Sequence, residues 1–493
     1  MKKIQFLSLM AMVIMALCSC TNTDYQKAIP ANATLVVKAD MKSISEKADF
    51  KNSKWKTMLD ASLVAVVKDK DMKSVKEYID DPMKTGIDFS MPLYLFMVGE
   101  ETAGVTMKVN DEGEVKDFLL LLQKQGLASK PVEKDGLMCG SLVDDISYAY
   151  DSKSLLLLAS MKGKGTSATN RMAHELMSIK EDDSFAGTEA FSRMNEEDDD
   201  VVTYTSGKWG EDILAYVLEA FVPAEIDMKD LDAIMCLNFE NGQASFKAKA
   251  WGKTDKAKAL LEEADKNFGT IDGKYIDCVS ANTLVWMGAN VKGEWALGKL
   301  KENKSVKEML FMLERAVDIE QMLRAVDGDV ALELQSKDGN VENMPEYVMY
   351  AELKNSDFLK DVDDWKASME DYGITMNSRG DNQYALMMDG DSYLWGVQGD
   401  DLFLSSENAA RGGKGGTHSL VAHKDDIKKN KCYIYVDIEK IPLADFARQS
   451  GMSFLVEPLD KLQSIVVKSS STDEVTLTIE LKDKGENFLK QLL

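Results

Sequence analysis

Cys20 is the residue whose type and position most clearly predict chemistry in this sequence. It follows Leu17-Cys18-Ser19, which places a Leu three residues before it and a small Ser directly before it. Signal-cleaving peptidases need a small residue before the cut, and the thiol that follows the cut can then be acylated. Cys18 suits this role less well, because the bulky Leu17 would stand before the cut. The sequence therefore predicts a lipidated Cys20.

The segment before this thiol has the pattern of an export signal. Lys2 and Lys3 give it a positive start, and an apolar run follows over residues 4–17. Such a run is too short to span a bilayer comfortably. We therefore expect a lipoprotein signal peptide over residues 1–19 and an anchor linker over residues 20–28.

The expected lipid also predicts a compartment. One acyl chain binds a membrane only marginally, so stable anchoring needs several chains, palmitate among them. Thr21 rather than Asp follows Cys20, so the sequence gives no reason for retention at the inner membrane. We expect anchoring at the outer membrane, with the body of the protein facing either the periplasm or the cell surface.

Three histidines are the next candidates for metal binding or acid–base catalysis. His174, His418 and His423 form no HExxH motif, and the last two are five residues apart, off a shared helical face. The sequence also contains no GxSxG nucleophile elbow. We therefore expect the histidines at surface or loop positions, and we expect no metal, no cofactor and no catalytic residue.

Two short motifs resemble those of penicillin-binding enzymes. Residues 53–56 read Ser-Lys-Trp-Lys, an SxxK sequence, and residues 84–86 read Lys-Thr-Gly. The chemistry would need the Lys of the first motif to activate its Ser beside a strand that carries the second. Here only a short segment separates the motifs, no SDN-type element lies between them, and the second has the character of a turn. We interpret both matches as chance.

Three further segments could bind ions. Gly/Lys-rich loops at residues 162–166 and 411–417 could hold an anion through backbone amides, but neither has the spacing of a P-loop. The acidic run at residues 196–200 could hold Ca²⁺, but it lacks the alternating ligands and central Gly of a calcium loop. We interpret the loops as flexible connections and the acidic run as a solvated charge run.

The overall composition excludes one class of partner and predicts a folded body. The formal net charge is −24, and removal of Lys2 and Lys3 with the signal peptide makes it −26. Such a surface repels phosphates, so nucleic acid is not an expected partner. A hydrophobic content of 45% argues against disorder, and the length that remains after the signal peptide predicts two domains.

Four cysteines remain beyond the signal region. Cys139, Cys236, Cys278 and Cys432 are scattered and form no CxxC motif, so this is not a disulfide scaffold. The second and fourth lie in apolar, strand-like runs, and we interpret them as buried free thiols. Whether any of the four pair stays open at this point.

Self-similarity divides the chain in two. Five blocks recur in the same order along the sequence. The matching blocks are residues 31–37 with 281–286, 105–110 with 350–355, 147–160 with 392–406, 201–205 with 432–436, and 231–251 with 462–481. A Gly/Lys-rich loop follows the third block in both copies. We therefore predict two tandem homologous repeat domains over residues 29–272 and 273–493.

Residue periodicity predicts sheets and helices within each copy. Apolar and polar residues alternate over 105–110, 244–250 and 475–481, which is typical of antiparallel strands with one buried face. Asn241-Gly242 predicts a hairpin turn between two strands. Apolar residues three and four apart over 213–221 and 358–372 predict helices.

The order strand, helix, two strands, helix can be drawn twice within a copy, which resembles ferredoxin-like units. The expected fold class is therefore α+β, with antiparallel sheets, helices packed on one face of each sheet, and two tandem homologous repeats.

Three features together resemble a known family. They are the lipobox that ends at Cys20, the start Pro30-Ala-Asn-Ala-Thr-Leu-Val36 and the repeated blocks. They are similar to an uncharacterised family of Bacteroides-type lipoproteins described as a domain of unknown function, and the resemblance covers nearly the whole mature chain. It implies the compartment and the architecture. It implies no activity, so it transfers no functional residue.

Three functional hypotheses follow. The first is a non-catalytic binding or scaffold module of the cell envelope, anchored through the lipid on Cys20, with an envelope protein or ligand bound between the two copies. The alternative is a periplasmic hydrolase whose carboxylate-based site forms only in the fold. The third is an assembly factor that uses sheet edges.

Overall fold

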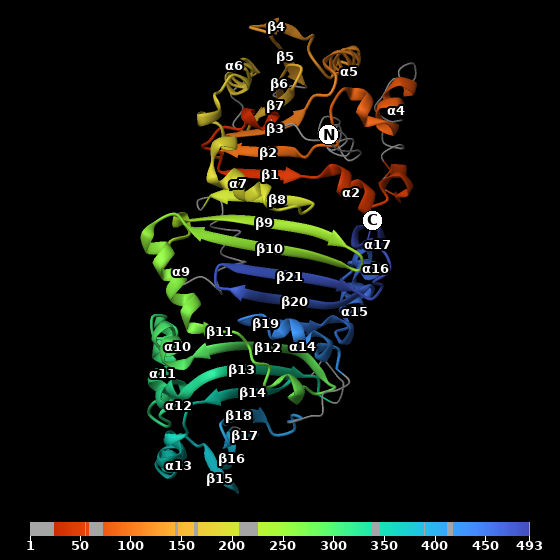
Figure 1. Ribbon diagram of the computed structural model, residues 1–493. Helices are drawn as coiled ribbons and strands as arrows, with labels where there is room; N and C mark the ends of the chain where they lie inside the picture. The colour runs from red at the N-terminus through yellow and green to blue at the C-terminus, as the bar shows by residue number, and fades with distance from the viewer. Residues whose placement is uncertain are drawn as a thin grey trace. The chain divides into compact units, whose positions relative to one another are not determined.

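The computed structural model describes residues 24–54, 56–58, 72–142, 146–161, 166–206, 225–337, 345–388, 390–411 and 418–492 (Figure 1). These residues form two compact units. Unit 1 comprises the described residues up to 206, Asp227–Thr254 and residues 483–492, and unit 2 comprises Asp255–Lys482 with residues 225 and 226. The predicted signal peptide, Cys20 and the predicted helix at 213–221 lie outside the described residues. Within the described chain, no helix is both long and apolar enough to cross a membrane.

Unit 1 contains a sheet in which every described strand pair is antiparallel. In spatial order its strands are β4 (Val132–Lys134), β5 (Leu137–Leu142), β6 (Ile146–Tyr150), β7 (Ser154–Ser160), β3 (Thr102–Lys108), β2 (Leu93–Val98), β1 (Leu35–Ala39), β8 (Val201–Ser206), β9 (Leu231–Glu240) and β10 (Gln243–Gly252). The predicted hairpin is confirmed, because Asn241 and Gly242 join β9 to β10 and Gly242 has a φ of 66°. The positive φ explains the Gly at this position.

The helices of unit 1 cover both faces of its sheet. They are α2 (Met41–Lys47), α4 (Met72–Asp80), α5 (Glu112–Lys124), α6 (Thr166–Met177), α7 (Glu189–Asn195) and α17 (Phe488–Leu492), with short 3-10 turns that include η1 (Asp24–Ala28). Helix α6 packs with Ala149 and Leu156, whereas α5 packs with Tyr148 and Leu155. Successive strand residues point to opposite faces, so these two helices lie on opposite sides. The expectation of helices on one face is therefore wrong for this unit.

The cause is visible in β7. Its sequence Ser-Leu-Leu-Leu-Leu-Ala-Ser does not alternate, and Leu155, Leu156 and Leu158 are all buried. A strand that is apolar on both sides needs cover on both faces. The ferredoxin-like arrangement is also wrong, because β1 and β2 pair directly and antiparallel, without the intervening strand of a split βαβ unit.

Unit 2 contains a sheet of the same kind. In spatial order its strands are β15 (Thr375–Gly380), β16 (Gln383–Met388), β17 (Asp391–Gln398), β18 (Asp401–Ser406), β14 (Glu346–Leu353), β13 (Val326–Gln335), β12 (Thr283–Lys292), β19 (Cys432–Asp437), β20 (Leu462–Ser471) and β21 (Glu474–Leu481). The two-residue strand β11 (Phe268–Gly269) pairs with the end of β12.

Helical segments cover both faces of this sheet too. They are α9 (Asp255–Asn267), η8 (Ile276–Cys278), α10 (Gly293–Leu300), α11 (Lys304–Leu313), α12 (Ile319–Ala325), η9 (Asp357–Asp361), α13 (Val362–Glu370), η10 (Ser419–His423), α14 (Lys424–Ile427), η11 (Ile438–Lys440), α15 (Leu443–Gln449), η12 (Ser453–Leu455) and α16 (Val456–Asp460). The predicted helix at 358–372 is confirmed in large part, since Phe358, Val362, Trp365 and Met369 are buried together. On the other face, η8 and η10 pack with Trp286 and Tyr433.

Candidate functional site

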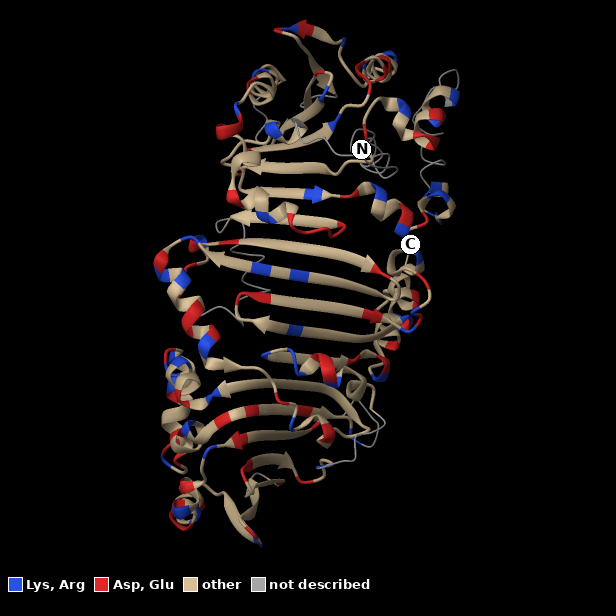
Figure 2. Ribbon diagram, in the orientation of Figure 1, with Lys and Arg blue, Asp and Glu red and all other residues tan. Residues whose placement is uncertain are grey.

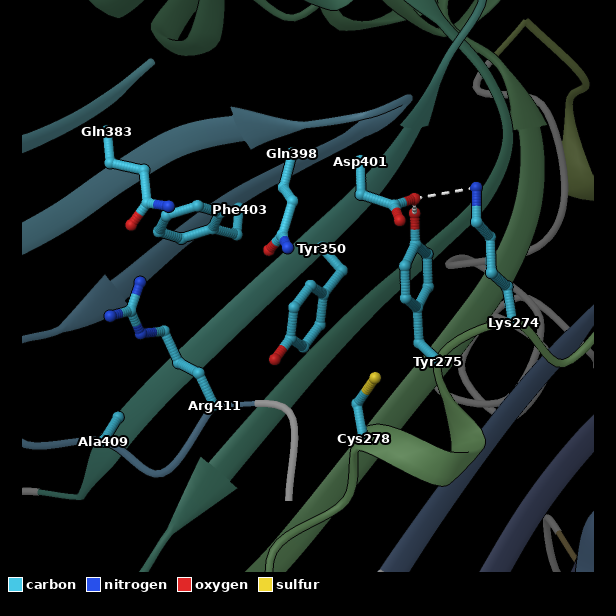
Figure 3. A pocket seen from close by; sticks show the side chains of 10 residues that line it. All are labelled: Lys274, Tyr275, Cys278, Tyr350, Gln383, Gln398, Asp401, Phe403, Ala409 and Arg411. Atoms are coloured by element: carbon cyan, nitrogen blue, oxygen red, sulfur yellow. Dashed lines mark hydrogen bonds and ion pairs between the residues drawn. The ribbon is translucent and has the colours of Figure 1, made fainter. Parts of the chain in front are cut away.

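A pocket of about 490 Å³ lies within unit 2, on the sheet face that η8 and η10 partly cover (Figure 3). Its aromatic wall consists of Tyr275, Tyr350 and Phe403. Tyr350 on β14 and Phe403 on β18 are direct cross-strand partners, so the register brings them side by side. Tyr275, which precedes η8, stacks on Tyr350 with ring centroids 5.0 Å apart and an interplanar angle of 13°. This wall offers flat apolar surface to a bound molecule.

One end of the pocket holds a charged network around Asp401. Lys274 Nζ lies 2.8 Å from Asp401 Oδ1 and 3.1 Å from Glu352 Oε1. The Tyr275 hydroxyl donates to the same Asp401 oxygen at 2.8 Å. Burial raises the pKa of Tyr275, and the neighbouring carboxylate raises it further, so the phenol stays a donor. Burial alone would lower the pKa of Lys274, but its two carboxylate partners raise it, so the ammonium stays charged.

A buried carboxylate positions the loop that carries Lys274 and Tyr275. Asp329 on β13 is 1% exposed and accepts hydrogen bonds from the backbone N–H groups of Asp272, Gly273 and Lys274 at 2.8–3.1 Å. Figure 2 shows that β13 carries several acidic residues along its length. Three backbone donors satisfy this carboxylate and fix the loop above the sheet.

The opposite end of the pocket is polar, and its side chains make fewer described hydrogen bonds and ion pairs than those around Asp401. The guanidinium of Arg411 lies over the ring of Phe403, 4.7 Å from its centroid. The segment that carries it is held by Gln335, whose amide donates to the Ala410 carbonyl at 2.9 Å and accepts from its N–H at 3.0 Å. Gln383 also lines this end, whereas Gln398 lies beside Asp401, its cross-strand partner (Figure 3). The side-chain amides of both have no hydrogen-bond partner among the described residues. These groups can recognise a polar ligand.

Cys278 brings a thiol to the pocket, but not a reactive one. Burial raises its pKa, and nearby carboxylates raise it further, so the neutral thiol dominates. The four cysteines expected beyond the signal region are free in the described chain. Cys236 is buried, as predicted, whereas Cys432 is half-buried.

The histidines lie elsewhere in the fold. His418 is 5% exposed, donates through Nε2 towards the Thr283 carbonyl at 3.1 Å and accepts through Nδ1 from the Leu420 N–H at 3.1 Å. It stands in the loop before η10, a position that the expectation allowed, but its ring is buried there and caps η10. His423 packs beside Tyr433 and Tyr435. His174, on α6, lies 3.2 Å from Asp135.

The two motifs that resemble penicillin-binding enzymes are not assembled into a site. The Ser53 hydroxyl donates to the Phe50 carbonyl at 2.7 Å, and Lys56 pairs with Asp80 at 2.9 Å. In the other motif the Thr85 hydroxyl donates to the Pro82 carbonyl at 2.7 Å. The serine and the lysine are therefore engaged in local structure, which agrees with a chance match.

The acidic run at 196–200 is only partly solvated. Asp200 is 2% exposed and accepts hydrogen bonds from Lys47, from Ser43 and from the Phe239 N–H. The interpretation as a solvated charge run is wrong for this residue, because three donors satisfy its buried carboxylate.

The ligand-capable atoms of Glu197, Asp199 and Cys236 lie within 4.8 Å of one another. However, Lys247 Nζ already pairs with Glu197 at 2.6 Å, and burial raises the pKa of the thiol. Lys247 therefore balances one of the two carboxylates, and the thiol stays neutral. The Gly/Lys-rich loops fall outside the described residues, except for Thr166, which begins α6, and Arg411.

Sequence reasoning singled out only Cys278 and Arg411, the first residue of a Gly/Lys-rich loop, among the pocket residues, and it assigned neither to a pocket. The others come from β14, β16, β17, β18, the loop before η8 and the segment after β18, and no motif links these segments. The sequence contained only a weak signal for this pocket. Tyr350 and Glu352 alternate with apolar residues, and so do Asp401 and Phe403. This alternation indicates that one face of the sheet carries aromatic and polar side chains.

Comparison with known proteins gives a family. Two solved structures, of TP0453 in crystal forms III and IV, are 8% identical in sequence with TM-scores of 0.27. The matches cover 50% and 46% of this chain and 88% and 81% of theirs, and similarity at this level defines neither fold nor function. No curated protein matches the chain. Residues 25–489 match the family described as Domain of unknown function (DUF4836), and the chain therefore belongs to this family.

Proposed function

We propose that the protein is a non-catalytic binding module of the cell envelope, and that its ligand occupies the pocket of unit 2. The observation that carries this proposal is the composition of the pocket. An aromatic wall formed by Tyr350 and Phe403 stands beside Gln383, Gln398 and Arg411, whose polar groups are not used by a described hydrogen bond or ion pair. Binding sites combine flat apolar surface with a few uncommitted polar groups in this way. The sequence-based hypothesis placed the ligand between the two copies, whereas this pocket lies inside one unit.

We further propose that the units arose from a duplication, with repeats over residues 29–272 and 273–493. The strands of the two sheets follow the same spatial order when β1 is matched with β12, β2 with β13 and so on to β10 with β21. Tyr25 and Tyr275 each stand six residues before an Ala-Asn pair that leads into the first strand of its unit. Shared order and shared spacing both support a common origin.

The duplication explains why the pocket occurs in unit 2. In unit 1, α6 covers β5, β6, β7 and η1. The matching elements of unit 2 are β16, β17, β18 and η8, which contribute half of the residues that line the pocket. In the described residues between β18 and η10 there is no helix to take the place of α6. The surface that α6 covers in unit 1 thus corresponds to the surface that lines the pocket in unit 2.

The proposed location rests on the N-terminal sequence. Acylation of Cys20 would hold the acidic body at the outer membrane, with its face towards the periplasm or the cell surface. The net charge of −24 suits a body that stands away from anionic lipid.

The hydrolase alternative receives less support at this pocket. A carboxylate-based glycosidase mechanism needs two acidic side chains that flank the scissile bond. Asp401 is the single carboxylate among the lining residues, and Lys274 and Tyr275 already engage it. The lining therefore favours binding over hydrolysis.

A blocking substitution tests the proposal. Gln398 is exposed at the pocket, so Gln398→Trp should fill the opening without disturbing the core. We expect compounds from a small-molecule screen to bind the wild type in ligand-observed NMR and to lose at least tenfold in affinity with Gln398→Trp. Asp391→Trp, at an exposed position on the same strand that does not line the pocket, is the matched control and should bind as the wild type does. Equal binding by all three proteins would contradict the proposed site.

A further inference from the structure

We infer that the pocket of unit 2 takes a small ring compound that carries one carboxylate, an assignment that rests on the binding function proposed above. The inference combines a guanidinium and two amides, none of which has a hydrogen-bond or ion-pair partner among the described residues, with an aromatic wall in one pocket (Figure 3).

The charge of the ligand follows from the two cations that line the pocket. Lys274 faces two carboxylates, Asp401 and Glu352, at 2.8 and 3.1 Å, so it has no spare positive charge for a ligand. Arg411 contacts the Phe403 ring, and no described carboxylate pairs with it. One guanidinium balances one negative charge, and its planar fork fits the two oxygens of a carboxylate. A ligand with two negative charges would leave one unbalanced close to Asp401.

The acidity of the whole chain strengthens this assignment. With a net charge of −24, the protein surface repels free anions, so an anion must be held by a specific local cation. Arg411 is exposed, and stacking on Phe403 limits the directions in which its guanidinium can point. The aromatic contact therefore positions the charge at the pocket.

The ring of the ligand follows from the wall beside this charge. Tyr350 and Phe403 lie opposite each other on neighbouring strands, and Tyr275 already covers one side of Tyr350. A ligand ring can stack against the remaining aromatic surface. The amides of Gln383 and Gln398 each offer both a donor and an acceptor to hydroxyl groups on that ring. Hydroxylated aromatic acids and acidic sugars share this chemistry.

Matched pairs of compounds test the inference on the purified full-length chain. The pairs are 4-hydroxybenzoate with 4-hydroxybenzyl alcohol, and glucuronate with glucose, so the two arms separate aromatic acids from acidic sugars. We expect the acid of at least one pair to bind about tenfold more tightly than its neutral partner, as one charge-assisted hydrogen bond allows. Arg411→Gln should reduce the affinity for the acid to that of the neutral compound. Arg448→Gln, which removes an exposed arginine paired with Asp445 and Asp460, is the control and should leave the preference unchanged.

The outcomes separate this inference from the binding function. If acid and neutral compounds bind equally and Gln398→Trp abolishes both, the charge assignment is overturned while the pocket remains the binding site. A preference for the acid that persists in Arg411→Gln also overturns the inference. Failure of all four compounds to bind overturns it as well, and the broader screen with Gln398→Trp then decides the binding function separately.

Discussion

Individual buried acids fix the loops of unit 2, and their role could not be predicted from the sequence. Glu333 is 2% exposed and accepts hydrogen bonds from the Ser280 N–H and the Thr283 hydroxyl, as Asp329 does from the loop before η8. Burial raises the pKa of Glu333, while these hydrogen bonds oppose the rise. An acid in a sequence is expected on the surface unless its partners are known. Those partners are far away in the sequence, so only the fold shows them.

His418 should make the stability of the protein depend on pH. Burial and the nearby Lys440 lower its pKa, while the hydrogen bond to Thr283 and the charge of Asp437 oppose the shift. An unfolded histidine titrates near pH 6.5. Because the folded pKa lies below that value, the unfolded chain binds more protons as the pH falls below about 6.5. The stabilising contribution of the neutral ring is therefore complete above this pH and is lost below it.

Urea unfolding at pH 7.5 and pH 5.5 measures this effect. We expect the free energy of unfolding of the wild type to decrease more between these values than that of His418→Gln, whose side chain does not titrate. His423→Gln, measured under the same conditions, controls for the removal of an imidazole elsewhere in unit 2. An identical pH dependence in the wild type and His418→Gln would show that His418 is not responsible.

At the scale of helices and strands, the local residue pattern predicts a strand well when only one face of its sheet is buried. It predicts poorly when both faces are buried. The alternation over 244–250 and the Asn-Gly turn predicted β10 and its hairpin, because both signals are local. The run of leucines in β7 gave no alternation, so the cover on its two faces could not be read from it. The pocket lay beyond prediction because strand register, which depends on distant partners, brings Tyr350 beside Phe403.

Two glycines within regular elements should respond to substitution in opposite directions. In β3, a Cβ added at Gly104 would clash with the buried ring of Phe96, its cross-strand partner. We expect Gly104→Ala to destabilise the protein by about 1–3 kcal/mol, as overpacking of a core does. In α10, nothing lies within 4 Å of a Cβ added at Gly298, so Gly298→Ala should stabilise by about 0.5–1 kcal/mol through helix propensity. Thermal or urea unfolding measures both changes. Unchanged or increased stability in Gly104→Ala would contradict the packing described for β3, and destabilisation by Gly298→Ala would contradict the open space described at α10.

At the scale of the whole molecule, the proposed duplication would have given two units of which one carries the proposed binding pocket. In unit 1, α6 covers β5, β6 and β7, and the proposed pocket lies at the matching strands of unit 2. Repeated sequence blocks predicted the repetition of elements, since each block maps to the same strand positions in both sheets. The difference between the copies could not be predicted, because it depends on which segments fold over each face.

The proposed anchor makes the strongest prediction about the whole molecule. Because the thiol of Cys20 would carry the lipid, Cys20→Ala should abolish incorporation of labelled palmitate in growing cells and release the protein from the membrane fraction or leave it unprocessed. Cys18→Ala removes the neighbouring thiol, leaves the small Ser19 before the cut, and should be labelled as the wild type is.

The two variants distinguish acylation at Cys20 from membrane association of the protein by another residue. An acidic body with a net charge of −26 after cleavage is not attracted to anionic lipid, so under this proposal the acyl chains supply the membrane association. If Cys20→Ala is still labelled and fractionates with membranes, another residue carries the lipid and the lipobox reading is wrong. If only Cys18→Ala loses the label, the cut lies two residues earlier, and the linker that holds the folded units at the membrane is correspondingly longer.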